Sequence, residues 1–309
     1  MKALNHKILI TLTAATLALV ACEDVIDPTL EEAEPLLVVD AWLNTQPGAQ
    51  VIRLTQTQPY FDNSTPLGVR GASVLVTNTT DGRVLQFEEV TTEPGTYQWV
   101  PAAPGERVGQ TGDLFNLALS VGNEQYTSVT RLGRVPQIDS IIFIYEAARG
   151  FFPENYQAEF FATDPAGAGD TYWIKAYKND TLLLKPGEIN IAFDAGFTAG
   201  GNFDGVTFIT PIRRGINPFD FDDDGNFLSP YLPGDSVYVE IHSISVAAFN
   251  FLNEAILQID RPGGFSELFA SPIANVSTNI NNVNPNGTKA VGFFNVAAVS
   301  GAGKRLIVE

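Results

Sequence analysis

The residues best suited to binding an ion lie in one short acidic stretch in the second half of the chain. Three carboxylates at alternate positions are followed by a glycine: Asp220, Asp222, Asp224 and Gly225. Alternating carboxylates before a glycine are typical of loops that wrap oxygen ligands around Ca²⁺. The twelfth position, which holds a bidentate Glu in an EF-hand, is Tyr231 here, although Asp235 could close the site. Two interpretations follow: a weak structural calcium site, and a solvated acidic turn.

Nucleophilic catalysis would depend on His242, because the other histidine, His6, lies in a segment that we expect to be removed. A Ser-His-Asp or Cys-His arrangement needs a histidine as its general base. His242 falls between an expected strand and an expected helix start, and the sequence contains no Gly-x-Ser-x-Gly motif. It also contains no His/Cys cluster of the kind that binds zinc. We therefore interpret His242 as structural and predict that the chain is not an enzyme. A hydrolase that uses two of the 35 acidic residues is the least favoured alternative.

The first 22 residues indicate export and anchoring. A charged start is followed by an apolar run from Ile8 to Ala21, which is the pattern of a secretory signal peptide over residues 1–21. The run is too short for a membrane-spanning helix, which needs about 20 apolar residues. The motif Leu19-Val20-Ala21-Cys22 resembles the bacterial lipobox, and Cys22 is the one cysteine of the sequence. We predict lipidation at Cys22; the alternative is a plain signal peptide with a chance cysteine.

Residues 22–35 form a short acidic tether that begins with Glu23-Asp24. Acidic residues directly after the cysteine resemble the surface-export signal of Bacteroidota lipoproteins, although an ordinary solvated tether has the same composition. The whole chain has 18 basic and 35 acidic residues and a net charge of −17. This charge disfavours nucleic acid and anionic membrane surfaces as partners. We predict a lipid anchor in the outer membrane with the protein at the cell surface.

Three short segments match an Asp-Ser/Thr-aliphatic pattern that resembles the O-glycosylation acceptor of Bacteroidota. They are Asp139-Ser140-Ile141, Asp180-Thr181-Leu182 and Asp235-Ser236-Val237. Ser140, Thr181 and Ser236 are therefore candidate glycosylation sites. The pattern is short enough for chance matches, and a strand beginning at such a segment would bury the hydroxyl.

Alternating apolar residues predict a β-rich first domain over residues 36–135. Strands are expected at 36–43, 51–57, 72–77, 83–88, 96–100, 114–121 and 125–131. Asp81-Gly82 and Gly122-Asn123 each separate two alternating runs, which is typical of β-hairpins. Seven short strands with regular turns favour an immunoglobulin-like β-sandwich.

Residues 136–309 are predicted to form a second β-rich, sandwich-like domain with long loops and one helix. Strands are expected at 139–145, 156–163, 171–178 and 237–241, with closing strands at 290–296 and 304–308. Ser243 or Ser245 can cap a helix near residues 243–260, and Pro262-Gly263-Gly264 would end it. The stretch 193–233 contains seven phenylalanines: Phe193, Phe197, Phe203, Phe208, Phe219, Phe221 and Phe227. They either fill a core beneath long loops or, if several are exposed together, mark a docking surface.

Several segments along the chain carry a resemblance to a known family. They are Cys22-Glu23-Asp24-Val25-Ile26-Asp27, Glu34-Pro35-Leu36-Leu37-Val38-Val39, Gly71-Ala72-Ser73-Val74, Pro136-Gln137-Ile138-Asp139-Ser140-Ile141, Pro272-Ile273-Ala274-Asn275-Val276 and Ala290-Val291-Gly292-Phe293-Phe294. With these segments the chain resembles the Bacteroidota outer-membrane lipoprotein family catalogued as domain of unknown function 4249. Gly292-Phe293-Phe294 departs slightly from the Gly-Tyr-Phe expected there.

The resemblance implies an outer-membrane lipoprotein that is often encoded beside a TonB-dependent receptor, and it supplies no catalytic residues. We therefore expect a non-enzymatic accessory protein that binds such a receptor during nutrient uptake. The alternative is an adhesin or structural surface module stabilised by calcium.

Overall fold

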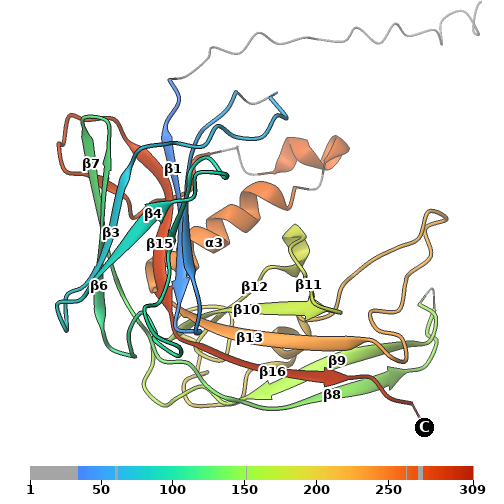
Figure 1. Ribbon diagram of the computed structural model, residues 1–309. Helices are drawn as coiled ribbons and strands as arrows, with labels where there is room; N and C mark the ends of the chain where they lie inside the picture. Colours follow the sequence, from blue (N-terminus) through green and yellow to red (C-terminus); the bar gives the residue numbers. More distant parts are fainter. Residues whose placement is uncertain (1–33, 60–61, 151, 262, 271–273, 309) are drawn as a thin grey trace, which may run out of the picture. The chain divides into compact units, whose positions relative to one another are not determined.

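The computed structural model describes residues 34–308, except 60–61, 151, 262 and 271–273. The predicted signal peptide, Cys22 and residues 22–33 of the tether lie outside the described residues. The described chain is mainly β, as the sequence predicted (Figure 1). No helix in this part of the chain is both long and apolar enough to cross a membrane.

Most strands and the longer helix lie where the sequence predicted them, but the closing strand expected at 304–308 lies at 299–305. In order the elements are β1 (Leu37–Asn44), β2 (Gln50–Gln56), β3 (Ser73–Asn78), β4 (Val84–Glu89), β5 (Thr96–Trp99), β6 (Leu114–Val121), β7 (Glu124–Arg131), β8 (Ile138–Glu146), β9 (Asn155–Ala162), β10 (Thr171–Lys178), β11 (Thr181–Leu182), η1 (Pro186–Glu188), β12 (Asn190–Phe193), α2 (Thr210–Arg214), β13 (Ser236–Ile244), α3 (Val246–Ile259), η2 (Gly264–Phe269), β14 (Asn281–Asn282), β15 (Ala290–Ala297) and β16 (Val299–Arg305).

A nine-stranded sheet contains all the strands of residues 36–135. Its order is β14-β7-β6-β3-β4-β5-β2-β1-β15, and alternate side chains of its strands point into one core. Tyr97, Phe115 and Phe294 are fully buried there. Burial of a side chain of this size contributes about 1.5–3 kcal/mol to stability.

The two ends of this sheet approach each other, so that it is nearly closed. β14 pairs with β7 at one end, and β15 pairs with β1 at the other. The side chain of Asn279, just before β14, donates to the carbonyl of Phe294 at 2.7 Å and accepts from its N–H at 2.9 Å. An amide side chain thus satisfies β15 backbone groups that would otherwise lack a strand partner, which protects a sheet edge.

The last part of the chain returns to the first sheet. β15 pairs in parallel with β1, more than 240 residues earlier, with Val38 opposite Val291 and Ala41 opposite Phe294. The two domain ranges, 36–135 and 136–309, remain predictions. The strand order nevertheless places β14 and β15, from the second range, in the sheet formed by the first.

A second sheet and a hairpin form the rest of the fold. The sheet has the order β11-β10-β13-β16, with β12 also paired to β10, and β8 pairs with β9. Their shared core contains Phe160, Tyr172, Phe208 and Tyr231, all fully buried. β9 and the short helix α2 contact each other, and this contact positions the site described below.

The predicted helix is present as α3. The Ser245 hydroxyl caps it by accepting from Ala248 N–H at 3.1 Å. α3 contacts β15 of the first sheet and β10 and β12 of the second (Figure 1). The apolar side of α3 is buried at Ala248 and Leu252, whereas Ile259 is exposed because the helix end leaves the core.

Candidate functional site

A pocket beside the β8–β9 hairpin brings together three separate stretches of chain. Its lining residues are Glu146, Ala147, Arg149, Phe152, Asn155, Gln157, Arg214, Asn217, Pro218, Phe219, Phe227 and Pro230. We call it the aromatic pocket. Its volume of about 490 Å³ lies in the range typical of small-molecule sites.

Four phenylalanine rings form a connected cluster at this pocket. Phe227 is the centre, with ring centroids 5.3 Å from Phe152, 5.4 Å from Phe219 and 6.0 Å from Phe221. Phe227 is 8% exposed, whereas Phe219, Phe221 and Phe152 are 62%, 51% and 48% exposed. Three large apolar side chains therefore remain accessible to solvent around one buried ring.

Two short backbone pairings position the side chains of this cluster. An isolated bridge pairs Phe221 with Phe227, and another pairs Arg149 with Phe152. Arg149 N–H donates to Phe152 C=O at 2.9 Å, and Phe152 N–H donates to Arg149 C=O at 3.1 Å. Because directly paired residues project to the same face, each pairing presents two side chains together.

Of the predicted calcium residues, Asp222 organises the turn between Phe221 and Phe227. The Asp222 carboxylate accepts from the N–H groups of Asp224 and Asn226 at 3.0 and 2.8 Å. These hydrogen bonds, with Asn226 contributing most, lower the pKa of Asp222. Asp220 pairs with Lys185. The structure does not bring Asp220, Asp222 and Asp224 together around a common point. Among the described residues, no group of three His, Cys, Asp or Glu side chains is arranged to hold a metal ion.

Glu146, Arg149 and Arg214 are the charged residues that line the aromatic pocket, and Arg214 also contacts the buried Glu159 behind the lining. The buried Glu159 carboxylate binds Arg213 at 2.7 Å and Arg214 at 3.0 Å, and Arg214 also contacts Glu146 at 3.3 Å. Burial alone raises the pKa of Glu159, but the two guanidinium groups outweigh it and lower the pKa. The Arg149 side chain is exposed and has no ion pair or hydrogen bond to any residue that the structure describes.

The base of the pocket is fixed by Asn217. Its side-chain oxygen accepts from Ala158 N–H at 2.7 Å, and its amide donates to the carbonyls of Ala158 at 2.8 Å and Arg214 at 2.7 Å. The loop after α2 is therefore attached to β9 by two hydrogen bonds, and a third ties it back to the end of α2. This attachment holds the loop that carries Phe219 in place before any ligand binds.

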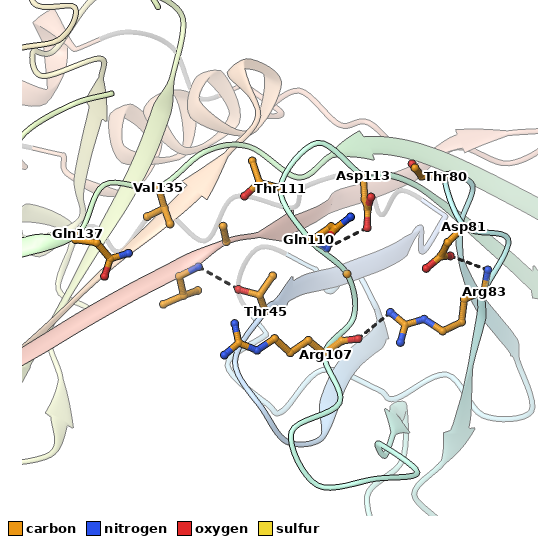
Figure 2. A pocket seen from close by; sticks show the side chains of 13 residues that line it. Thr45, Thr80, Asp81, Arg83, Arg107, Gln110, Thr111, Asp113, Val135 and Gln137 are labelled. Atoms are coloured by element: carbon orange, nitrogen blue, oxygen red, sulfur yellow. Dashed lines mark hydrogen bonds between the residues drawn. The ribbon is translucent and has the colours of Figure 1, made fainter. Parts of the chain in front are cut away.

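A second pocket, of about 760 Å³, lies where β16 and residues 135–137 meet the first sheet (Figure 2). Its lining is mostly polar: Thr45, Thr80, Asp81, Arg83, Arg107, Gly109, Gln110, Thr111, Asp113, Val135, Gln137, Ala298 and Val299. The Arg83 guanidinium donates to the carbonyl of Arg107 at 2.7 Å, and Asp113 accepts from Gln110 N–H at 3.0 Å. Asp81 accepts from Arg83 N–H at 2.9 Å. Both carboxylates are thus committed to local turns and are not positioned as an acid–base pair.

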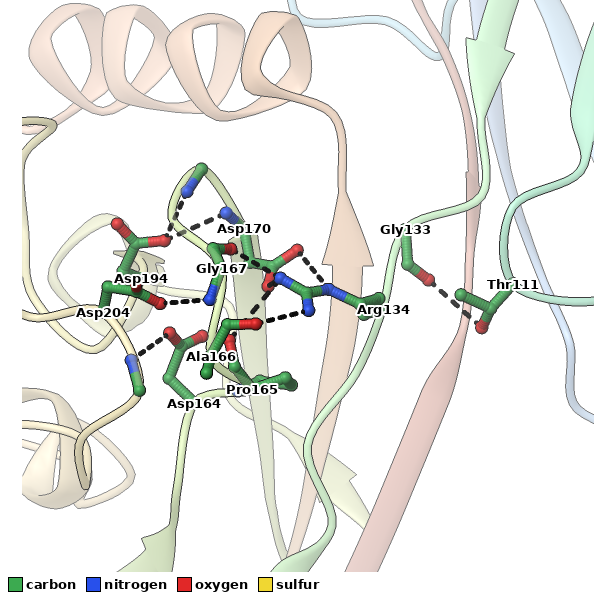
Figure 3. A network of polar contacts seen from close by, with 12 residues as sticks. Thr111, Gly133, Arg134, Asp164, Pro165, Ala166, Gly167, Asp170, Asp194 and Asp204 are labelled. Carbon is green, nitrogen blue, oxygen red and sulfur yellow. Dashed lines mark hydrogen bonds and ion pairs between the residues drawn. The ribbon is translucent and has the colours of Figure 1, made fainter.

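A polar network fixes the connection between β7 and β8 (Figure 3). The Arg134 guanidinium contacts the Asp170 carboxylate at 2.6 Å and donates to the carbonyl of Ala166 at 2.8 Å. Asp194 accepts from the N–H groups of Gly169 and Asp170, and Asp204 accepts from Gly167 N–H. Asp170, Asp194 and Asp204 thus all bind donors of the same chain. We therefore interpret this network as structural.

Residues 23–301 match the family described as Domain of unknown function (DUF4249). This chain belongs to that family. No curated protein matches the sequence. Because the family has no assigned function, the function of this DUF4249 chain has to be argued from its own residues.

His242 lies inside the DUF4249 chain, away from both pockets. It is buried, and its Nε2 lies 2.8 Å from the Glu240 carboxylate. Gln46 and Tyr177 also donate to Glu240, at 2.7 and 3.2 Å. Burial raises the pKa of Glu240, but these hydrogen bonds, led by that of His242, outweigh it and lower the pKa to about 2. Burial lowers the pKa of His242, which keeps its ring neutral at neutral pH.

The three candidate glycosylation residues lie on strands. Ser140 is exposed on β8, and Thr181 is exposed on β11. Ser236 begins β13 and is partly buried, with its N–H donating to the Asn179 side chain at 2.8 Å.

The aromatic pocket is the best candidate site of this DUF4249 chain. The sequence indicated Phe219, Phe221 and Phe227 as members of an aromatic stretch. It did not indicate Arg149, Phe152 and Arg214, because these belong to other segments and meet the loop only in the folded chain. The one local signal for Arg149 and Phe152 was the turn at Gly150 between two apolar segments. A turn signal does not show which loop the turn contacts in the folded chain.

Proposed function

We propose that this chain is a lipid-anchored outer-membrane protein that binds a TonB-dependent receptor and assists nutrient uptake without catalysing a reaction. The lipobox-like Leu19-Val20-Ala21-Cys22 and the acidic residues after it support the anchor and the surface location. The resemblance that these segments share with Bacteroidota lipoproteins supports the receptor as partner. The aromatic pocket supports a binding role.

The single observation that carries the binding role is the exposure of Phe219 and Phe221. Exposed aromatic rings lose hydrophobic stabilisation that burial would supply, about 1.5–3 kcal/mol for each side chain. Clustered exposed aromatics beside arginines are typical of the residues that dominate binding energy in protein interfaces. We therefore assign the rim of the aromatic pocket, represented by Phe219 and Phe221, as the surface that meets the receptor.

The polar residues of the aromatic pocket support a role without catalysis. Glu146 is the one carboxylate among its described lining residues, and it is in contact with Arg214. Hydrolysis of a glycosidic bond uses two carboxyl groups on opposite sides of that bond. The arrangement supports recognition of a ligand better than proton transfer.

Recovery of partners from native outer membranes tests this proposal. We expect a tagged chain to recover a β-barrel receptor of the TonB-dependent class. The double variant Phe219→Ala/Phe221→Ala should reduce that recovery about tenfold or more, because central aromatic residues dominate interface energies. Leu67→Ala, which removes an even more exposed apolar side chain elsewhere, should leave it unchanged.

Absence of any β-barrel receptor from the wild-type eluate would remove the proposed partnership. Binding to cells or glycans that persists after deletion of the receptor would favour the adhesin alternative instead.

A further inference from the structure

We propose that the aromatic pocket holds a small amphipathic organic anion, with its apolar part against Phe219 and Phe227 and its acidic group on Arg149. The inference rests on the proposed binding function and specifies the ligand class of the same pocket. An amphipathic organic anion here means an aromatic or aliphatic body that carries one carboxylate, sulfonate or phosphate.

The apolar half of the pocket is formed by rings that are already in place. Phe152 and Phe227 meet edge to face at 5.3 Å and 84°, and Phe219 lies 5.4 Å from Phe227. Pro218 and Pro230 are buried beside them and restrict the backbone on both sides of the loop. A flat apolar group can therefore contact the accessible faces without reordering the protein, and preorganisation of this kind favours affinity.

The acidic group of the ligand is recognised by Arg149. Arg149 lines the pocket next to Phe152, its backbone partner, and its guanidinium has no partner among the described residues. Arg214 lines the same pocket, but its guanidinium already forms ion pairs with Glu159 and Glu146. Guanidinium groups bind carboxylate, sulfonate and phosphate through charge-assisted hydrogen bonds.

Charge distribution supports an anion over a cation or a neutral ligand. The whole chain carries a net charge of −17, which opposes anion binding over most of its surface. The lining of the aromatic pocket differs locally, with two arginines and one carboxylate, although the adjoining turn carries Asp220, Asp222, Asp223 and Asp224. An unpaired arginine beside exposed rings, in an acidic protein, specifies a ligand that is both apolar and anionic.

A pair of fluorescent probes tests the inference directly. 1-Anilinonaphthalene-8-sulfonate has an aromatic body and one sulfonate, and N-phenyl-1-naphthylamine has the same body without the sulfonate. The protein is the mature chain from residue 22 with Cys22→Ala, so that no acyl chain competes for the probes. We expect the sulfonate probe to bind at one site, about tenfold more tightly than the neutral probe.

Matched variants show which residues bind the sulfonate of the probe and which bind its aromatic body. Arg149→Gln should weaken the sulfonate probe about tenfold and leave the neutral probe unchanged. Phe219→Ala should weaken both probes. Arg107→Gln, which removes an exposed arginine from the other pocket, should change neither. An unchanged near-ultraviolet circular dichroism spectrum confirms that each variant is folded.

Equal affinity of the two probes, or equal losses with Arg149→Gln and Arg107→Gln, would overturn the inference. Sulfonate binding that is insensitive to Phe219→Ala would overturn it as well. The receptor is measured separately, by recovery from native membranes. Receptor recovery without selective probe binding rejects only the ligand class, and selective probe binding without receptor recovery rejects only the proposed partnership.

Discussion

The arrangement of single side chains separates structural acids from groups that remain free to bind. Glu240, Asp222 and Asp194 each accept hydrogen bonds from donors of the same chain. Arg149 has no such partner among the described residues and lines a pocket with exposed rings. At this scale, the groups that remain available are an arginine and aromatic rings, which favour recognition over catalysis.

The buried His242 predicts a pH dependence of stability that can be assigned to one residue. Its pKa is lowered by burial below its ordinary value of 6.5, so the folded state binds fewer protons than the unfolded state just below that pH. The contribution of neutral His242 to the free energy of unfolding should therefore be fully present above about pH 6.5. It should fall on acidification, by at most about 1.4 kcal/mol per pH unit. His242→Gln, which keeps a donor for Glu240, should flatten this fall.

Urea denaturation between pH 7.5 and 5.5 measures the effect, in a window above most carboxyl groups. If removal of the predicted signal peptide also removes His6, His242 is the one histidine that titrates there. Identical pH profiles for the wild type and His242→Gln would show that His242 is not the responsible group.

The acidic turn at residues 220–226 gives a prediction about metal removal. Asp220 pairs with Lys185, and Asp222 is used by the turn itself, so the turn needs no cation to hold its shape. A chelator should therefore leave the melting temperature unchanged. A fall of several degrees with chelator, restored by added Ca²⁺, would show a calcium site that this geometry does not contain.

At the scale of elements, the parallel pairing of β1 with β15 is the contact that joins the two ends of the described chain. Gly292 of β15 has a φ of +92°, and a Cβ at this position would overlap the carbonyl oxygen of Val39. The strand pairing therefore requires glycine there for both backbone angle and space.

Gly292→Ala should lower the free energy of unfolding by more than about 2 kcal/mol, because strain and overlap act together. Gly187→Ala is the matched control, since a Cβ there contacts nothing within 4 Å. It should change stability by less than about 0.5 kcal/mol. Equal unfolding midpoints for the two variants would contradict the proposed constraint.

Local elements were predictable from the sequence, and their distant partners were not. The hairpin at Asp81-Gly82 appears as β3 and β4, and the helix begins at Ser245. Turn residues and caps act over a few positions, so the sequence shows them directly. The pairing of β1 with β15 depends on tertiary packing across most of the chain and has no local signature.

The same limit applies to the candidate site. The sequence shows Phe219, Phe221 and Phe227 as members of an aromatic stretch, but it does not show which of these rings are buried in the folded chain. Phe208, from the same stretch, is fully buried, whereas Phe219 is 62% exposed. Arg149 and Phe152 reach the cluster from the turn after β8, which only the folded chain shows.

At the scale of the whole molecule, a β-rich body carries the preformed aromatic pocket, and residues 22–35 before it are predicted to form an acidic tether with a lipid anchor at Cys22. The anchor would restrict the protein to a membrane surface. The pocket would then meet a membrane partner at a high local concentration, which favours even a weak interaction.

Site-specific photo-crosslinking in the native cell tests the partnership most directly. Benzoylphenylalanine in place of Phe221, at the pocket rim, should crosslink to a β-barrel receptor of the TonB-dependent class. The same residue in place of Leu67, which lies on a loop distant in sequence and is more open to solvent than Phe221, should not. Equal crosslinking from both positions, or no receptor crosslink from position 221, would contradict the account.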